Sequence, residues 1–344
     1  MMLDERKIKI LRAIIDDYIA TAEPVGSRTI ARKYRMGISP ATIRNEMADL
    51  EELGYISQPY TSAGRIPSDK GYRFYVDFLM NCKKLDEKDI FIINQLLKKR
   101  IRELEDFIED TSKTISNLTN YTALILGPEL NNSFLKHIEI IKIENKKGLV
   151  VIITNLGNVV HQIIDIPDGF KDNELTRISN LLNTFLKYKT IDEITPELME
   201  NVKHEIIEHE EVICILMNIL IETLNQFREG GKVYYFGSSK MLDFPEFRDL
   251  DKARSFLSLL EEEDLISNIL KSITKPNKIS ISIGNENPWK ELQDYSIITT
   301  NFSIDNNNLY ILGVLGPTRM DYSRVVTILK ELVESLKERV NNIL

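Results

Sequence analysis

The stretch that decides the fold is residues 22–77, which read AEPVGSRTIARKYRMGISPATIRNEMADLEELGYISQPYTSAGRIPSDKGYRFYVD. Near its middle, Ser39 and Pro40 place a capping hydroxyl and a first-position proline at the start of a helix. A shorter helix precedes it, with Ser27 as its expected cap and an end near Gly37. Two short helices separated by a tight, glycine-containing turn are typical of a helix-turn-helix.

This helix-turn-helix has a predicted element on each side. Over residues 4–21, apolar residues recur three or four positions apart, which predicts an amphipathic helix that stops before Pro24. Downstream, Ile56 can pair with Ile66 around a Ser-Ala-Gly turn, and two nearby prolines limit the pairing to a small ribbon. Such a ribbon is a wing, so residues 1–80 are predicted to form a winged helix-turn-helix.

The helix that starts at Ser39-Pro40 has two different faces. At 100° per residue, Ile43, Met47 and Leu50 fall within a narrow arc that must face the core. The opposite face carries small and polar residues in its first turns. Small residues let the backbone approach base edges, Asn can pair bidentately with adenine, and Arg can do so with guanine. The predicted base-reading residues are Ala41, Thr42, Arg44 and Asn45.

The distribution of charge agrees better with DNA binding than the net charge of −8 does. Residues 1–80 hold 12 Lys or Arg and 11 Asp or Glu, and the window 24–45 contains five Lys or Arg and no acidic residue. A local basic face on an acidic protein is compatible with phosphate contacts, which a helix N-terminus can assist. Ser27 and Arg28 are the predicted phosphate contacts, and Arg32 is predicted to bind DNA beside them. At the expected tip of the wing, Arg65 is expected to reach either a minor groove or a phosphate.

Simpler interpretations of the same pattern stay open. The exposed face can belong to an ordinary surface helix of mixed charge, and the arginine of the hairpin can be merely solvated. A winged helix can also serve protein contacts alone, within an enzyme or a signalling module.

The sequence lacks the motifs of a nucleotide-binding protein, a hydrolase, a metalloprotein or a membrane protein. No glycine-rich nucleotide loop and no G-x-S-x-G elbow occurs, and His204 and His209 are five apart, too far round a helix to clamp one metal. Cys82 and Cys214 are too few for a disulfide framework or a zinc site. No apolar run approaches the ~18 residues of a membrane span, and the N-terminus lacks a signal-peptide core. We therefore expect a cytoplasmic protein that is not an enzyme, needs no cofactor or metal, and stays out of the membrane.

Beyond residue 80, helical and strand-like segments alternate. The apolar spacing over residues 86–119 predicts one long helix or two in series, either as a spacer or as a core element. Three strand-like runs between 137 and 166 predict a meander, which a helix over 173–186 follows. Three more strands are expected between 278 and 315, and a terminal amphipathic helix begins at Tyr322.

Strands that are separated by a distant helical block indicate an α+β domain with an insertion. The insertion is mostly helical, with one strand-like stretch at 232–236, and is a plausible dimerisation element. The predicted division is a winged helix (1–80), a helical linker (81–120), an α+β domain (121–189 and 276–344) and an inserted dimerisation domain (190–275).

Residues 22–77 resemble the N-terminal domain of the HrcA heat-inducible repressors, in which a winged helix is followed by a GRIPS-D-GYR-YVD segment. Two further stretches look like the family's, SISIGNENPWKELQDYS (280–296) and LGVLGPTRMDYSRVV (312–326). The resemblance is weakest between about 86 and 275, where we assign no functional residue.

The resemblance implies an α+β multidomain fold, with a GAF-like α/β domain interrupted by an inserted dimerising domain. It further implies a homodimer that binds double-stranded DNA at the CIRCE inverted-repeat operator of class I heat-shock (chaperone) genes. The GroEL chaperonin is the implied partner that keeps the repressor active. A winged-helix regulator whose GAF-like domain senses a small metabolite is the alternative.

Overall fold

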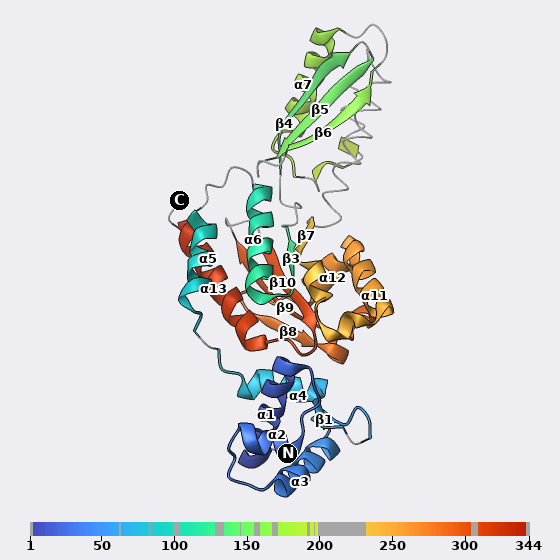
Figure 1. Cartoon of the computed structure of the whole chain (residues 1–344). Helices are drawn as coiled ribbons and strands as arrows, with labels where there is room; N and C mark the ends of the chain where they lie inside the picture. The colour runs from blue at the N-terminus through green and yellow to red at the C-terminus, as the bar shows by residue number, and fades with distance from the viewer. Residues whose placement is uncertain are drawn as a thin grey trace. The chain divides into compact units, whose positions relative to one another are not determined.

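The computed structural model divides the chain into two compact units, Met1–Gly127 with Lys232–Leu344, and Pro128–Gly231 (Figure 1). Each unit is taken by itself below. The structure describes residues 3–61, 63–82, 84–98, 104–127, 134–144, 146–154, 159–166, 171–190, 193–195, 197–198, 232–303 and 309–341.

The first unit begins with the predicted winged helix-turn-helix. Its core is aliphatic, because Ile14, Ile30 and Ile43 are all fully buried between the helices. In the ribbon, Ile56 pairs with Pro67 in antiparallel register. The elements are α1 (Glu5–Thr21), α2 (Ser27–Lys33), α3 (Pro40–Glu52), β1 (Ile56–Ser57), β2 (Ile66–Pro67), α4 (Asp69–Phe74) and the π-helix η1 (Tyr75–Leu79).

The rest of the first unit is built on an antiparallel sheet whose described strands run in the order β7-β3-β10-β9-β8. The residues of the central strand β10 are buried on both faces after its first position, which its continuous apolar sequence predicts. A Cβ on Gly313 would come within 2.8 Å of Leu270, so one helix packs directly against the backbone of this strand. The strands are β3 (Thr122–Leu126), β7 (Val233–Phe236), β8 (Ser280–Ile283), β9 (Tyr295–Ser303) and β10 (Leu309–Pro317).

Amphipathic helices lie on both sides of this sheet (Figure 1). The first side carries α5 (Glu87–Lys98), α6 (Leu104–Thr119) and the terminal helix α13 (Tyr322–Asn341), and the second carries α11 (Leu250–Glu261) and α12 (Glu263–Ile273). Short helical turns connect them, namely α10 (Ser238–Met241), η4 (Pro245–Arg248), η5 (Gly284–Glu286) and η6 (Lys290–Leu292).

The second unit pairs a meander with one helix. Strands β4 (Leu135–Glu144), β5 (Lys147–Thr154) and β6 (Val159–Asp165) form an antiparallel sheet in chain order, and α7 (Asp172–Leu186) packs against β4. The Asn183 side chain bonds both the N–H (2.9 Å) and the C=O (2.6 Å) of Ile138, and Ser179 Oγ accepts from the Ile140 N–H (3.0 Å). These side chains pair the backbone groups at the edge of β4 and fix α7 against it.

The predicted secondary structure is largely present, but its assembly differs from the prediction. The meander forms a sheet of its own instead of joining the C-terminal strands, and the inserted unit begins near Pro128 instead of residue 190. Residues 232–275 belong to the first unit, where β7 pairs with β3 through Ala123 and Phe236. Alternation identifies a strand and its buried face, but it does not say which distant strand will pair with it.

The predicted linker over residues 81–120 is also not a spacer. Its residues form two helices in series, and α6 packs on β3 and β7 with Ile115 completely buried. The α+β multidomain class with an N-terminal winged helix is confirmed, whereas the GAF-like assignment of the larger sheet stays a prediction.

In the part of the chain that the structure describes, every helix is too short or too polar to cross a membrane. In the same part, no three His, Cys, Asp or Glu side chains are grouped to hold a metal ion. His204, His209 and Cys214 lie outside the described residues, and Cys82 is a free, exposed thiol.

Candidate nucleic-acid interface

The cap and the core packing of α3 determine which of its side chains face outward. Ser39 Oγ accepts from the Thr42 N–H at 3.1 Å, and Pro40 occupies the first turn, so the helix begins where the sequence predicted. Ile43, Met47 and Leu50 are buried against the other helices. The first turns on the opposite side are therefore held outward on a rigid helix.

Three of the four predicted base-reading residues are exposed on this surface, and the fourth is half-buried. Ala41, Arg44 and Asn45 are exposed on it, whereas Thr42 is half-buried and its hydroxyl lies 3.0 Å from Ser39 Oγ. Thr42 is therefore part of the cap. The exposed group combines one methyl, one amide and one guanidinium, which is a set of side chains suited to base edges.

Several cations near this face have no acidic partner among the residues that the structure describes. The exposed side chains of Arg28, Arg32, Arg35 and Arg44 form no ion pair with any residue that the structure describes. Lys33, from the same acid-free window, is instead paired with buried Asp17 of α1. An unpaired guanidinium keeps its donors available, so these four arginines can bind DNA at phosphates or at base edges.

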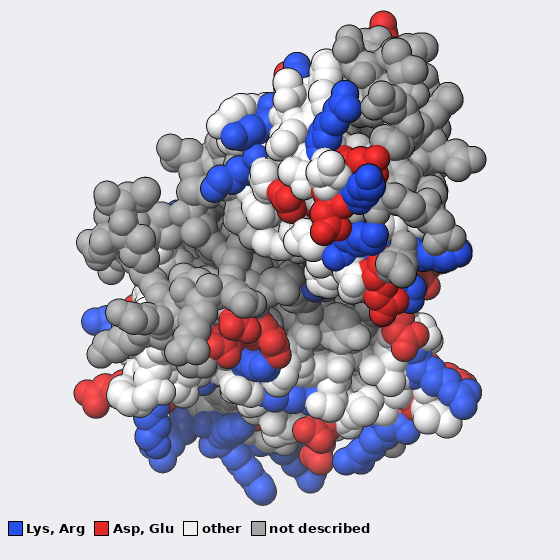
Figure 2. All heavy atoms as spheres, turned by 90° about the horizontal axis from the view of Figure 1, so that it is seen from above, with Lys and Arg blue, Asp and Glu red and all other residues white. Residues whose placement is uncertain are grey.

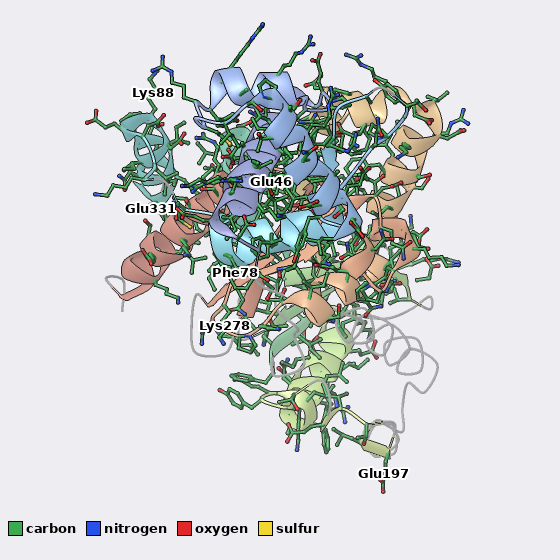
Figure 3. All side chains as sticks on the ribbon, turned by 90° about the horizontal axis from the view of Figure 1, so that it is seen from below. Glu46, Phe78, Lys88, Glu197, Lys278 and Glu331 are labelled. Atoms are coloured by element: carbon green, nitrogen blue, oxygen red, sulfur yellow. The ribbon has the colours of Figure 1, made fainter. Side chains whose placement is uncertain are left out.

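Two acidic residues of α3, Glu46 and Asp49, are paired with cations of α1. Lys7 of α1 lies 2.8 Å from Glu46 and 3.0 Å from Asp49, and Arg6 lies 3.3 Å from Glu46. The hydrogen bond to Glu46 is the largest of the effects that raise the pKa of Lys7 above its ordinary value. Figure 3 shows Glu46 among the helices of the winged helix, so these carboxylates hold α3 to α1.

Charges of both signs are mixed on the face drawn in Figure 2. Among the described residues there, Lys and Arg side chains lie between Asp and Glu side chains, so the net charge of −8 is not spread as a continuous acidic surface. The chain can therefore be acidic as a whole and still present a locally basic face.

Arg65 does not lie at the tip of the wing, and the predicted position is wrong. Its backbone exchanges two hydrogen bonds of 2.9 Å with Val25, which places it at the base of the hairpin. Its guanidinium lies 2.7 Å from Glu51 at the end of α3, and its side chain is 20% exposed. Arg65 therefore attaches the wing to the helix-turn-helix, and its DNA contact stays a prediction.

Close backbone packing reinforces this attachment. A Cβ on Gly64 would come within 2.5 Å of Val25 and 2.6 Å of Pro24, so only glycine allows the base of the wing to lie on the α1–α2 connection. The exposed end of the wing instead presents Tyr60, which is 65% exposed. Our sequence reasoning missed Tyr60, although its place in the Gln-Pro-Tyr-Thr-Ser-Ala-Gly loop could have indicated it.

The start of α2 also differs in detail from the prediction. The helix is preceded by Gly26, which offers no side-chain cap, and Ser27 is its first residue with only 9% of its surface exposed. A hydroxyl so placed is a poor phosphate donor, whereas its neighbour Arg28 is exposed. The phosphate contact predicted at this helix start therefore falls mainly to Arg28.

Comparison with known proteins gives consistent results over the whole chain. Residues 2–76 match the family described as "Winged helix-turn-helix transcription repressor, HrcA DNA-binding", and residues 105–326 match "HrcA protein C terminal domain". A heat-inducible transcription repressor HrcA of Acetivibrio thermocellus is 41% identical, covering 100% of this chain and 98% of the relative. The protein of the same name from Desulforamulus reducens is also 41% identical, over 100% of this chain and 99% of the relative.

One solved structure is similar along its full length. It is the crystal structure of a hypothetical protein at 2.2 Å resolution, with a TM-score of 0.64, 24% identity and 99% of each chain covered. At that identity the likeness concerns the fold.

Proposed function

The chain belongs to the HrcA family, and from that premise we propose that it represses class I heat-shock (chaperone) genes by binding an inverted-repeat CIRCE operator as a homodimer. The observation that carries the proposal is the outward face of α3, where Arg44 and Asn45 stand exposed, with Arg28 and Arg32 exposed on the neighbouring helix. In helix-turn-helix proteins this part of the second helix enters the major groove. The protein would act as a cytoplasmic regulator without catalytic activity.

In the proposed complex the residues have separate roles. Arg44 and Asn45 read base edges while Ala41 lets the backbone approach. Arg28 and Arg32 bind phosphate and set the register without carrying sequence information. Two winged helices in a two-fold dimer would take the two halves of the inverted repeat.

We assign the dimerising role to the inserted unit, Pro128–Gly231. The ends of this insertion leave and re-enter the sheet side by side, because the Gly127 N–H donates to the Lys232 C=O at 3.0 Å. A unit inserted in this way can contribute an interface without interrupting the sheet around it. Replacing residues 128–231 by a short turn should give a monomer by light scattering, with cooperative unfolding of the remaining domain as the control for folding. A dimer in that variant would place the interface elsewhere.

The chaperonin proposal rests on the family alone. GroEL would keep the repressor in its active form, and heat would withdraw chaperonin toward unfolded proteins. Titrating the repressor with operator DNA measures its active fraction, which should rise after incubation with chaperonin and ATP. An equal active fraction with chaperonin, with serum albumin and with buffer would contradict this part of the proposal.

Footprinting on the host's chaperone-gene promoters tests the central proposal. The full chain should protect an inverted repeat, and scrambling one half of that repeat should abolish most of the affinity. Binding should also weaken as salt rises, because phosphate contacts release counterions. Equal affinity for the intact and the half-scrambled repeat would refute the dimeric operator complex.

A further inference from the structure

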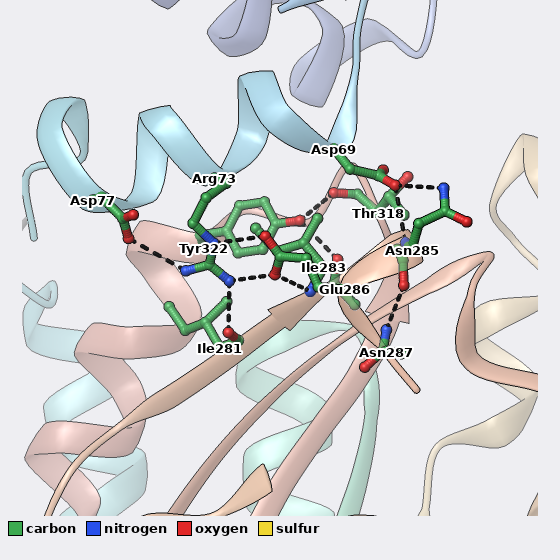
Figure 4. Close-up of polar contacts among 12 residues, drawn as sticks. Asp69, Arg73, Asp77, Ile281, Ile283, Asn285, Glu286, Asn287, Thr318 and Tyr322 are labelled. Atoms are coloured by element: carbon green, nitrogen blue, oxygen red, sulfur yellow. Dashed lines mark hydrogen bonds and ion pairs between the residues drawn. The ribbon is translucent and has the colours of Figure 1, made fainter. Parts of the chain in front are cut away.

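The three stretches that resemble the HrcA family, residues 22–77, 280–296 and 312–326, meet at α4 (Figure 4). There α4 contacts the part of the first unit that is built on the β7-β3-β10-β9-β8 sheet, which we call the larger domain. Asp69 is the first residue of α4, and its Oδ2 accepts from both the backbone N–H (2.9 Å) and the side-chain amide (2.8 Å) of Asn285. Asn285 belongs to the turn after β8. Both protons of this contact thus come from the larger domain and end on one carboxylate of the winged helix.

One helical turn further on, Arg73 makes a second, independent contact with the same turn. Its Nε and Nη2 donate to the two carboxylate oxygens of Glu286 at 2.8 and 2.5 Å, and Nη2 also donates to the Ile281 C=O at 2.7 Å. Glu286 is itself held, because its Oε2 accepts from the Ile283 N–H at 3.0 Å. Bidentate pairing of this kind fixes direction as well as distance.

The two surfaces also fit closely around these polar pairs. Gly284 has φ +50°, and a Cβ there would lie 2.5 Å from the carboxylate of Asp69, so no larger residue allows the same approach. Beside it, the buried rings of Tyr72 and Tyr322 lie 5.9 Å apart. On the other flank, Arg319 donates to the Ile19 C=O of α1 at 3.1 Å.

The covalent connection between the two parts is irregular. Residues 80–86 lead from η1 to α5, and those that the structure describes form neither helix nor strand, although the Asn81 C=O accepts from Ser323 Oγ of α13 at 2.6 Å. The direction in which the winged helix faces is therefore set by the non-covalent contacts. We call Asp69, Arg73, Asn285 and Glu286 the interdomain latch.

We propose that the interdomain latch positions the winged helix for DNA reading, and so determines which spacing between two operator half-sites the repressor accepts. This inference rests on the proposed dimeric binding to an inverted repeat. One base pair of spacing rotates a half-site by roughly 34–36° about the DNA axis, because B-DNA repeats in about 10–10.5 base pairs. A winged helix held in one direction can match only one such arrangement, whereas one held only by residues 80–86 can match several.

The test changes only the larger domain, so the DNA-reading residues stay intact. Asn285→Asp places a second carboxylate against Asp69, and Glu286→Lys places a cation against Arg73. Glu286→Gln is the milder variant, since it keeps an acceptor for the Ile283 N–H. Glu291→Lys is the matched control for the Glu286→Lys change, because it reverses the same charge at an exposed residue of the same loop region outside the latch.

Two measurements are made on the full-length dimer. Hydrogen exchange at residues 284–286 reports, without DNA, whether the latch has opened. Dissociation constants are then measured on inverted repeats whose spacer is lengthened or shortened by one, two and five base pairs, and on a single half-site.

The wild type and Glu291→Lys should prefer one spacer by at least about tenfold over its one-base-pair neighbours, the selectivity expected of a fixed half-site geometry. Asn285→Asp/Glu286→Lys should exchange faster at residues 284–286, bind the single half-site like the wild type, and lose most of that preference. Faster exchange with the spacer preference intact would overturn the inference. A wild type that binds no inverted repeat better than a half-site would instead overturn the proposed dimeric function.

Discussion

Replacing Arg44 with alanine should weaken operator binding without weakening the fold. Arg44 is exposed in the second turn of α3 and pairs with no carboxylate among the residues that the structure describes, so the free protein loses no partner. Alanine and arginine are both good helix formers and differ by only a few tenths of a kcal/mol. The melting temperature of Arg44→Ala should therefore stay close to that of the wild type.

The loss of binding free energy and its salt dependence distinguish a contact to a base from a contact to a phosphate. A bidentate contact to a base is worth about 1–3 kcal/mol, or roughly 5- to 150-fold in Kd at 1.4 kcal/mol per decade. A dimer would use the residue twice, so the loss on a full operator can reach about double that free energy. A phosphate contact would instead weaken binding to all sequences and lower the slope of log K against log salt by about 0.9 per contact.

Fluorescence anisotropy at several salt concentrations measures both quantities, on the operator and on a scrambled duplex. Arg12→Ala is the matched control, since Arg12 is a partly exposed arginine of α1 away from the base-reading face. The variant Asn45→Ala should behave like Arg44→Ala if both read bases. Wild-type affinity and specificity in both variants would refute the assignment of α3 as the recognition helix.

Three further outcomes follow from local geometry. Ser39→Ala removes the cap of α3 and should cost about 1 kcal/mol in urea unfolding, and an unchanged midpoint would contradict the cap. Gly37→Ala should cost about 1 kcal/mol of unfolding free energy, because Gly37 has a positive φ. Gly284→Ala should cost more, because Gly284 has a positive φ and also faces a carboxylate, and equal losses would argue against the close contact. Burial raises the pKa of Tyr121 to about 12, above its usual 10.0, so its neutral form contributes stability that is fully present below pH 10 and is lost as pH rises toward 12. The decline should be shallower in Tyr121→Phe, and an equally steep one would rule out Tyr121 as its source.

Much of the DNA-reading surface was predictable because its signals are local. The Ser-Pro start of α3, the spacing of Ile43, Met47 and Leu50, and the exposed Arg44 and Asn45 all lie within one helix. The cap and the periodicity act over a few residues, so neither depends on the rest of the chain.

The position of Arg65 in the hairpin could not be predicted from the residues next to it in sequence. A hairpin with an arginine suggested a cation at its tip, but Val25 and Glu51 hold that arginine at its base. Both partners lie outside the hairpin, so no pattern within it could reveal them. The interdomain latch could not be predicted from the sequence either, since Arg73 and Glu286 are more than two hundred positions apart and each has the sequence context of an ordinary surface charge.

The sequence alone determined the helix-turn-helix, its capped recognition helix, most of the helices and strands, and the family resemblance. Only the tertiary structure decided that β3 pairs with β7, that β4, β5 and β6 form a separate sheet, and that α4 is joined to the turn after β8. The reason is physical. Helix caps and periodicity are set by neighbours a few residues away, whereas strand pairing and ion pairs form only after the chain closes over a hundred or more residues and many alternative partners compete.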